Sequence, residues 1–362
     1  MSYVWAAPAI LAGIYYLIAL LAAILHLRRS DPAPGFTPPV SLLKPLYGRD
    51  PHLEEALRSQ AGQDYPDFEM LLGAADPSDP ALAAVERLPN ARIVPSTTAA
   101  ANGKVGVLID LARAARHPIL LVSDSDIRAG EGYLAAVVAP LADPKVGVVT
   151  CLYRATSYRW PGRWEALGIA TEFAPSVLVA PLAGVGEFAL GSTMVFRAAD
   201  LERAGGFEAL ADFLADDYQL GRRISALGLS VALSRTVVET HLAGDSWGAV
   251  WRHQLRWSRT IRVSRSAGYY GYLVTQASLW SLVALATGHW AAALGAMVVR
   301  LAAGIVVGVG VLGDRNVARY WYLIPFRDLW GFAVWLAGAF GNRVEWRGIR
   351  LELDSSGRIR RV

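Results

Sequence analysis

Two acidic residues follow one hydrophobic stretch of the sequence, in a pattern that could hold a metal ion. The segment "ILLVSDSD" (119 to 126) runs from four apolar residues into Asp124 and Asp126, two positions apart. Mg²⁺ and Mn²⁺ prefer such hard oxygen ligands and often bind through one or two carboxylates together with substrate phosphates. A solvated acidic loop, in which Asp126 caps the next helix, explains the same residues without a ligand.

Two further acidic pairs occur elsewhere in the chain. Asp76 and Asp79 follow another apolar run, and Asp216 and Asp217 stand at the start of an expected helix within residues 213 to 228. The positive end of a helix dipole stabilises carboxylates at such a position. Capping of the first helical turn is the alternative explanation for the second pair.

Basic and aromatic residues alternate in "WRHQLRWSRTIR" (251 to 262), which could face an anionic ligand. A helix lying on a membrane surface explains this composition equally simply. The residues are four arginines and three rings: Arg252, Arg256, Arg259, Arg262, Trp251, His253 and Trp257.

Lys104 and Gly191 are weaker candidates. Lys104, in "ANGKVG", could contact a phosphate or nucleotide, or it could be a solvated lysine at a helix start. Gly191 opens "GSTMVFR" (191 to 197) and would permit close approach of a ligand to the backbone, although it could be an ordinary sheet glycine.

Alternating strands and helices are expected to position these residues. The helix-like segments span residues 51 to 62, 79 to 88, 103 to 116 and 131 to 141, whereas strand-like apolar runs span 40 to 46, 68 to 74, 91 to 95, 119 to 124 and 146 to 152. Such alternation predicts an α/β fold with a mostly parallel sheet, in which ligands bind beyond the carboxyl ends of the strands.

The composition indicates a membrane protein. Of the 362 residues, 54% are hydrophobic and only 18% are charged. Residues 3 to 27 contain no Asp, Glu, Lys or Arg and are long enough to span a bilayer. Arg28 and Arg29 follow them, so the positive-inside rule predicts an outward amino terminus and a cytoplasmic catalytic region. A cleaved signal peptide is the alternative, but the run is too long and lacks a basic n-region.

Charge and cysteine content agree with that location. The net charge is +4, with basic residues beside apolar segments, which favours anionic lipid over nucleic acid as a partner. The single cysteine, Cys151, excludes an intramolecular disulfide and fits a reducing compartment.

The carboxyl-terminal third is also apolar. Residues 272 to 290 and 291 to 313 could form two spans joined by a turn, with Arg300 facing protein or water rather than lipid. Residues 319 to 341 contain Pro325, Arg327 and Asp328, and we expect an interfacial or re-entrant segment rather than a full span. Residues 157 to 182 lack the uninterrupted apolar length of a span and predict an interfacial element or a buried helix.

In this order, these sites resemble the motifs of a membrane-bound family A glycosyltransferase of the ceramide glucosyltransferase group, and most closely the bacterial enzymes that glycosylate hopanoids. The segments that carry the resemblance are "KPLYGRDPHLEEALRSQAGQDYPDFEMLL", "ADPSDPA", "SDSDIR", "GGFEALADFLADDYQLG" and "HQLRW". The resemblance implies a GT-A type domain with transmembrane helices at both ends.

The resemblance also implies individual roles. Asp76 would contact the uridine, and Asp124 matches the aspartate of the second motif. Asp126 stands where other family A transferases keep the metal-binding acid, which implies Mg²⁺ or Mn²⁺ as cofactor. Asp217 would be the general base, with Asp216 as the acid before it. Arg256 would meet the diphosphate and Trp257 the acceptor, whereas His253 departs from the Gln or Arg of the last motif.

The expected reaction is an inverting, metal-dependent transfer of N-acetylglucosamine or glucose from a UDP-sugar to a hydroxyl of a membrane lipid. One base and one metal without a second nucleophile fit a single displacement, so a β-glycoside is expected. We expect a hopanoid acceptor, with ceramide as the alternative. A processive polysaccharide synthase or a non-catalytic membrane scaffold would share several of these features.

The expected protein is a multi-pass protein of the cell inner membrane, with its catalytic domain in the cytoplasm. The expected divisions are an anchor at 1 to 29, a linker at 30 to 39, a GT-A domain at 40 to 265, a membrane region at 266 to 342 and a basic cytoplasmic tail at 343 to 362.

Overall fold

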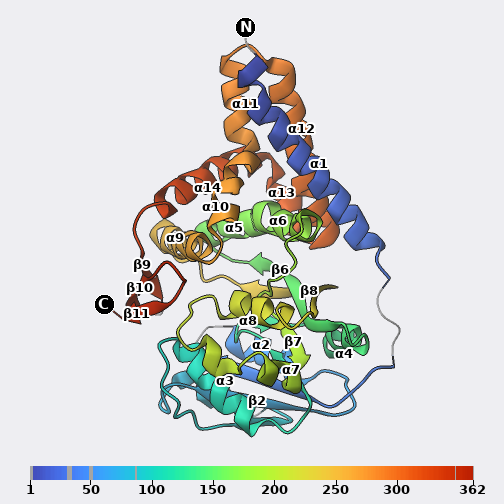
Figure 1. Ribbon diagram of the computed structural model, residues 1–362, viewed down its shortest axis with the longest axis vertical. Coiled ribbons are helices and arrows are strands. Elements are labelled where there is room, and N and C mark those ends of the chain that lie inside the picture. Colours follow the sequence, from blue (N-terminus) through green and yellow to red (C-terminus); the bar gives the residue numbers. More distant parts are fainter. Residues whose placement is uncertain (1–2, 31–34, 49–51, 86–87, 347, 362) are drawn as a thin grey trace.

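The computed structural model describes residues 3–30, 35–48, 52–85, 88–346 and 348–361. Figure 1 shows three tiers, with α1 (Ala7–Arg28), α11 and α12 forming a bundle at the top and an α/β layer at the bottom. Between these tiers lie α5, α6, α9, α10 (Ser266–Gly271) and α14. Part of the expected linker, residues 31 to 34, lies outside the described residues.

The lower tier is built around a mixed sheet of eight described strands in the order β3-β2-β1-β4-β7-β6-β8-β5. The pairs β3-β2, β2-β1, β1-β4 and β6-β8 are parallel, whereas β7 is antiparallel to both neighbours and β5 is antiparallel to β8. The strands are β1 (Val40–Leu46), β2 (Phe68–Ala74), β3 (Ala91–Ile93), β4 (Ile119–Val122), β5 (Ile127–Arg128), β6 (Val146–Thr156), β7 (Met194–Arg197) and β8 (Ser230–His241).

Helices cover both faces of this sheet, which makes β1 buried along its whole length. Successive side chains of a strand point to opposite faces. Leu42 therefore packs in one core cluster with Leu57 of α2, whereas Leu43 packs in the other with Leu108 of α3. The helices of this tier are α2 (Leu53–Ala61), α3 (Gly103–Ala114), α4 (Tyr133–Val138), α7 (Ala198–Arg203) and α8 (Asp216–Ser225).

The predicted α/β fold with a mostly parallel sheet is confirmed. All five apolar runs expected to be strands contain one, with ends that agree within a few residues except at β6, which extends to Thr156. In the segment expected to be helical at 79 to 88, the described residues, 79–85 and 88, contain a short 3₁₀ turn, Pro80–Ala84, in place of an α-helix. Its capping residue Asp79 accepts hydrogen bonds from Ala81 N and Gly48 N, so this acid has a structural role.

In the described part of the chain, three helices are long and apolar enough to cross a membrane: Ala7–Arg28, Trp160–Ala183 and Trp290–Val311. The expectation that residues 157 to 182 lack this length was wrong, because 24 residues there form one continuous helical run. That run is the most buried of the three, and Figure 1 shows its parts α5 (Trp160–Gly168) and α6 (Ala174–Val179) lying crosswise below the bundle.

The two expected tail spans differ in structure. The first is interrupted at Gln276, and α11 (Ala277–Ala286) rises only about 15 Å, half the thickness of a bilayer core. The turn at Gly288 is present, and α12 (Trp290–Ile305) follows it. Arg300 is fully buried and forms an ion pair with Asp328 of α14 (Ile324–Gly338), which confirms that it faces protein.

Residues 343–346 and 348–361, in the expected basic tail, are folded. They form a three-stranded antiparallel sheet in the order β11-β10-β9. Its strands are β9 (Arg343–Trp346), β10 (Ile349–Leu353) and β11 (Ile359–Arg361). This sheet lies beside α9 (Trp247–Ser264), where Figure 1 shows it in red at the side of the molecule.

Candidate active site

The carboxyl ends of three neighbouring parallel strands form one edge of the sheet, and Asp76 and Asp124 both lie there. Asp76 follows β2, and Asp124 follows β4, with β1 between the two strands. Strand β7 runs in the opposite direction, so it begins at this edge, three residues after Gly191. The topology therefore places residues that are far apart in sequence at one edge of the sheet, as expected for an α/β ligand site.

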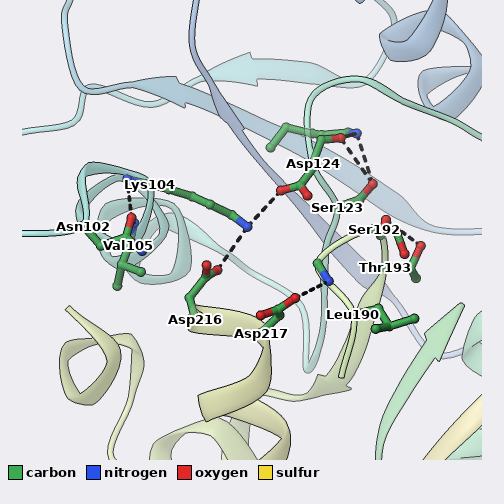
Figure 2. Close-up of polar contacts among 12 residues, drawn as sticks. Asn102, Lys104, Val105, Ser123, Asp124, Leu190, Ser192, Thr193, Asp216 and Asp217 are labelled. Atoms are coloured by element: carbon green, nitrogen blue, oxygen red, sulfur yellow. Dashed lines mark hydrogen bonds and ion pairs between the residues drawn. The ribbon is translucent and has the colours of Figure 1, made fainter. Parts of the chain in front are cut away.

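Lys104 is the central cation of this edge (Figure 2). Its Nζ lies 2.8 Å from Asp124 Oδ1 and 3.0 Å from Asp216 Oδ2, and its side chain is only 8% exposed. Burial by itself would lower the pKa of Lys104, but the two carboxylates outweigh this effect and raise it. Lys104 is thus a permanent cation at the site, and the solvated-lysine interpretation is wrong.

Asp217 lies next to this ion pair at the start of α8. Its Oδ2 accepts a hydrogen bond from the backbone N–H of Gly191 at 2.9 Å. Burial raises the pKa of Asp217 to about 6, the charge of Asp216 adds to the increase, and Lys104 opposes it. A carboxylate with a pKa near neutrality can accept a proton from an attacking hydroxyl.

Gly191 is needed because the backbone passes between two carboxylates. A β-carbon at this position would lie 3.2 Å from Asp124 Oδ2 and 3.4 Å from Asp217 Oδ2. Asp124, which follows β4, and Asp217, in α8, therefore both face the backbone at Gly191. The close-approach interpretation of Gly191 is supported, with Asp124 and Asp217 as the groups that approach it.

Asp126 belongs to the adjoining part of the site. Its Oδ2 accepts a hydrogen bond from Thr240 Oγ1 at 2.6 Å, and the side chain lines a pocket of about 310 Å³ together with His241. Burial raises the pKa of Asp126, and the nearby charge of Asp124 raises it further. A divalent cation beside these two carboxylates would relieve both effects.

Lys44 is a site residue that the sequence analysis missed. It is fully buried in β1, and its Nζ donates to Asp124 O at 2.7 Å and to Ser123 Oγ at 3.3 Å. Burial lowers the pKa of Lys44 to about 7, against the attraction of Asp126 and Asp124. The signal that could have identified it is the rarity of lysine in the sequence. The chain has only three lysines, and two of them, Lys44 and Lys104, lie at this site.

Other predicted residues lie outside this cluster in the contacts described. Asp76 is exposed and accepts hydrogen bonds from the N–H and hydroxyl of Ser78. On α9, the ring of Trp257 lies 6.2 Å from that of Phe173, and Arg256 is the half-buried residue before it. His253 Nδ1 lies 2.6 Å from Glu165 Oε1, so the departure from the family motif pairs a histidine with a buried acid.

Within the described ranges, no three His, Cys, Asp or Glu side chains group closely enough to form a ready-made metal site. The donors present are the carboxylates of Asp124 and Asp126, with the imidazole of His241 in the same pocket as Asp126. Mg²⁺ and Mn²⁺ commonly use one or two carboxylates and complete their coordination with substrate phosphates. The donor set therefore fits a metal that binds together with a diphosphate.

The mixed sheet and its order of strands agree with the GT-A type fold of the glycosyltransferase that the structural comparison finds. Residues 3–359 match the profile of Glycosyl transferase family 21, and the chain belongs to that family. It is similar over 93% of its length to a mannosyltransferase from Pyrobaculum calidifontis solved with GDP-Man and Mn²⁺, which shares 22% identity at a TM-score of 0.57 and is covered to 98%.

Curated relatives include ceramide glucosyltransferases. Ceramide glucosyltransferase 1 of Caenorhabditis elegans is 28% identical over 238 residues, which cover 62% of this chain and 51% of the relative. The ceramide glucosyltransferase of Komagataella phaffii is 29% identical over 153 residues, covering 37% and 30%. The chain spans about half the length of the relative with the longer match. These relatives support the ceramide glucosyltransferase group, and nothing in the comparisons supports a hopanoid enzyme.

Proposed function

We propose that this chain transfers a hexose from a UDP-sugar to a hydroxyl of a membrane lipid, with inversion at the anomeric carbon. The observation that carries the proposal is Lys104, held between Asp124 and Asp216, with Asp217 facing the same glycine backbone as Asp124. A cation for an anionic donor and a carboxylate base for the acceptor are then only a few ångströms apart. The scheme uses one base and no second nucleophile, which fits a single displacement at the anomeric carbon.

The donor would lie along the carboxyl edge of the sheet. Lys104 supplies positive charge for the diphosphate, which is needed most when the sugar bond breaks and negative charge grows on the leaving group. Asp124 would contact the sugar or ribose through its half-exposed carboxylate, and Asp76 would contact the uridine. Arg256 remains our candidate for a second diphosphate contact.

Asp126 would hold a divalent metal, with Asp124 and His241 as neighbouring donors. The mannosyltransferase of the same fold was solved with Mn²⁺ and a sugar nucleotide. When bound, the metal would neutralise charge on the diphosphate. Thr240 fixes the orientation of Asp126 through the 2.6 Å hydrogen bond.

A ceramide-type lipid is the first acceptor to test, because the curated relatives are ceramide glucosyltransferases. The sequence resemblance favoured a hopanoid, and that remains a prediction without support from the comparisons. We place the catalytic tier on the cytoplasmic face of the membrane because Arg28 ends α1 and Arg29 follows it directly.

The acceptor would reach Asp217 from the membrane side. A pocket of about 300 Å³ is lined by Tyr218 and Arg222 of α8 and by Ser264 and Arg265. Arg265 lies where α9 ends and the chain turns toward α11. Tyr218, the residue after the proposed base, and Arg265, at the connection to the membrane bundle, both line this pocket. Trp257 would line the acceptor path from α9.

The deciding experiment supplies membranes containing the full-length chain with labelled UDP-glucose and UDP-N-acetylglucosamine, and offers ceramide and a hopanoid polyol as acceptors. Mass spectrometry of extracted lipids should show one added hexose on a lipid hydroxyl. NMR of the product should show a β-linkage. Release of free sugar without any glycolipid would contradict a lipid acceptor, and an α-linkage would contradict single displacement.

A further inference from the structure

The segment that carries Asp216 and the proposed general base Asp217 lacks a side-chain cap at the start of helix α8. Residues 211–217, here called the catalytic segment, lead into α8 through Ala215, which provides no side-chain hydrogen bond to the helix start. The side chain of Ala215 therefore does not hold the helix start in place. The carbonyl groups of residues 211 to 213 accept hydrogen bonds from other parts of the chain, and these bonds help to set the positions of Asp216 and Asp217.

Asn102 holds this segment on one side. Its backbone N–H donates to Ala211 O at 2.8 Å, and its side-chain amide donates to Phe213 O at 2.8 Å. The side-chain oxygen of the same residue accepts from Lys104 N at 3.0 Å and caps α3. Asn102 is fully buried, so one residue fixes both the helix of Lys104 and the catalytic segment.

The carboxyl-terminal sheet holds the segment on the other side. The backbone N–H of Ile359 donates to Asp212 O at 2.8 Å, and Arg358 forms a β-bridge with Phe213. The guanidinium of Arg358 also lies 5.6 Å from the centre of the Phe213 ring. Leu214 completes the hydrophobic core of the small sheet, packing with Val344, Leu351, Leu353 and Ile359.

The same sheet is attached to the membrane-proximal helices. Arg262 of α9 donates to Asn342 Oδ1 at 2.7 Å and to Gly341 O at 2.6 Å, just before β9 begins. Arg259 donates to Phe340 O at 3.2 Å. The sheet therefore bridges the end of α14, helix α9 and the catalytic segment.

We infer that the carboxyl-terminal sheet is a positioning element of the active site, which clamps the catalytic segment against Asn102 and so sets where Asp216 and Asp217 stand relative to Lys104. The expected fall in kcat rests on the proposed function, whereas the expected change in hydrogen exchange depends only on the local stability of the catalytic segment. Asn102, Arg358 and Ile359 are positioning residues that act through the two acids.

The test compares hydrogen–deuterium exchange in the full-length wild type and in Ile359→Pro, which removes the N–H bonded to Asp212. Exchange of amides in residues 211 to 219 should rise about tenfold, the effect of one lost hydrogen bond. Arg360→Ala is the matched control, because Arg360 lies on the same strand paired with Glu352 and should leave exchange unchanged. Unchanged exchange in a folded Ile359→Pro protein overturns the clamp.

A second variant keeps the test decisive if the proline prevents folding. Asn102→Ser keeps an oxygen that can cap α3 but removes the amide that donates to Phe213, so it should loosen the same peptides from the opposite side. In both variants we expect kcat to fall about tenfold, with UDP affinity within twofold of wild type. Equal loss of UDP affinity and kcat would indicate general damage and overturn the positioning role.

The two proposals fail separately in this design. A wild type that glycosylates no lipid contradicts the proposed function but leaves the exchange comparison readable. Active wild type with no change in exchange in either variant contradicts the clamp alone.

Discussion

Lys104 Nζ and Asp124 Oδ1 lie 2.8 Å apart, joining the start of α3 to the end of β4. The pair is not isolated, because the same Nζ also contacts Asp216 at 3.0 Å. Two carboxylates around one cation leave a net negative charge, which a divalent metal and a diphosphate together can balance. This charge balance agrees with the proposed donor, which would bind together with a divalent metal.

Replacement of Lys104 by Met should lower kcat/KM for the donor by about 100-fold, since it removes a buried cation aimed at the diphosphate. Lys104→Arg should retain part of the activity because its charge remains. Lys145→Met is the control, as this exposed lysine lies far along the sheet from the cluster. Steady-state kinetics with varied UDP-sugar gives the comparison, and equal kinetics for Lys104→Met and Lys145→Met would contradict the donor role.

Transfer should depend on pH through Asp217, whose pKa burial raises to about 6. A general base acts in its deprotonated form, so kcat should be level above this pKa and fall about tenfold per pH unit below it. Asp217→Asn should lower kcat by about 10²- to 10⁴-fold at pH values above this pKa, and the difference from the wild type should shrink below it. A rate that stays constant from pH 7 to pH 5 would assign the base elsewhere.

Removal of divalent metal by EDTA should abolish transfer, and added Mn²⁺ or Mg²⁺ should restore it. Asp126→Asn should raise the metal concentration needed for half-maximal activity, because a carboxylate ligand becomes a weaker amide ligand. Asp64→Asn, at an exposed position, should leave that concentration unchanged. Full activity in EDTA would argue for a metal-independent mechanism in which Lys104 acts alone on the diphosphate.

The fold could be predicted from the sequence wherever a strand is buried on both faces, since β1, β2 and β4 are continuous apolar runs. Strand β8 escaped prediction because it is mostly half-buried and includes polar residues. Strand β5 is only two residues long, and it forms through pairing with β8 rather than through its own sequence.

The sequence indicated the candidate acids that end a strand or begin a helix, because the apolar run before a strand end and the pattern of a helix start can be recognised in neighbouring residues. Lys44 lies inside an apolar strand, where only the three-dimensional contact with Asp124 shows its importance. Similarly, no local pattern indicates that Asn102 and Ile359 hold the same segment, since they are separated by most of the chain.

Gly191→Ala should reduce kcat/KM by about 10- to 100-fold with little change in thermal stability, because small displacements of reacting groups have large kinetic costs. The added carbon would lie 3.2 Å from Asp124 Oδ2, which must shift by a few tenths of an ångström, and 3.4 Å from Asp217 Oδ2, which it would contact. Gly186→Ala in the preceding loop is the control, with no described heavy atom within 4 Å of its β-carbon. Equal activity in the two variants would show that the acids tolerate the displacement.

Removal of one partner of the Arg300–Asp328 ion pair should strongly destabilise the protein. Arg300 is fully buried, its Nη2 and Nε donate to the two Asp328 oxygens at 2.6 and 3.0 Å, and Ser278 donates to the same carboxylate. Asp328→Ala leaves the arginine charge buried without its partner and should destabilise the protein by about 3 to 5 kcal/mol.

The double variant Arg300→Met with Asp328→Leu should recover most of that loss, because an apolar pair of similar volume carries no desolvation penalty. Thermal unfolding in detergent, with Asp64→Asn as a surface control, measures all three proteins. If the single and double variants lose equal stability, then packing at these positions, rather than the uncompensated charge, sets the cost. In that case the size and shape of the two side chains would stabilise the bundle. Replacing both with uncharged residues would then not restore the wild-type melting temperature.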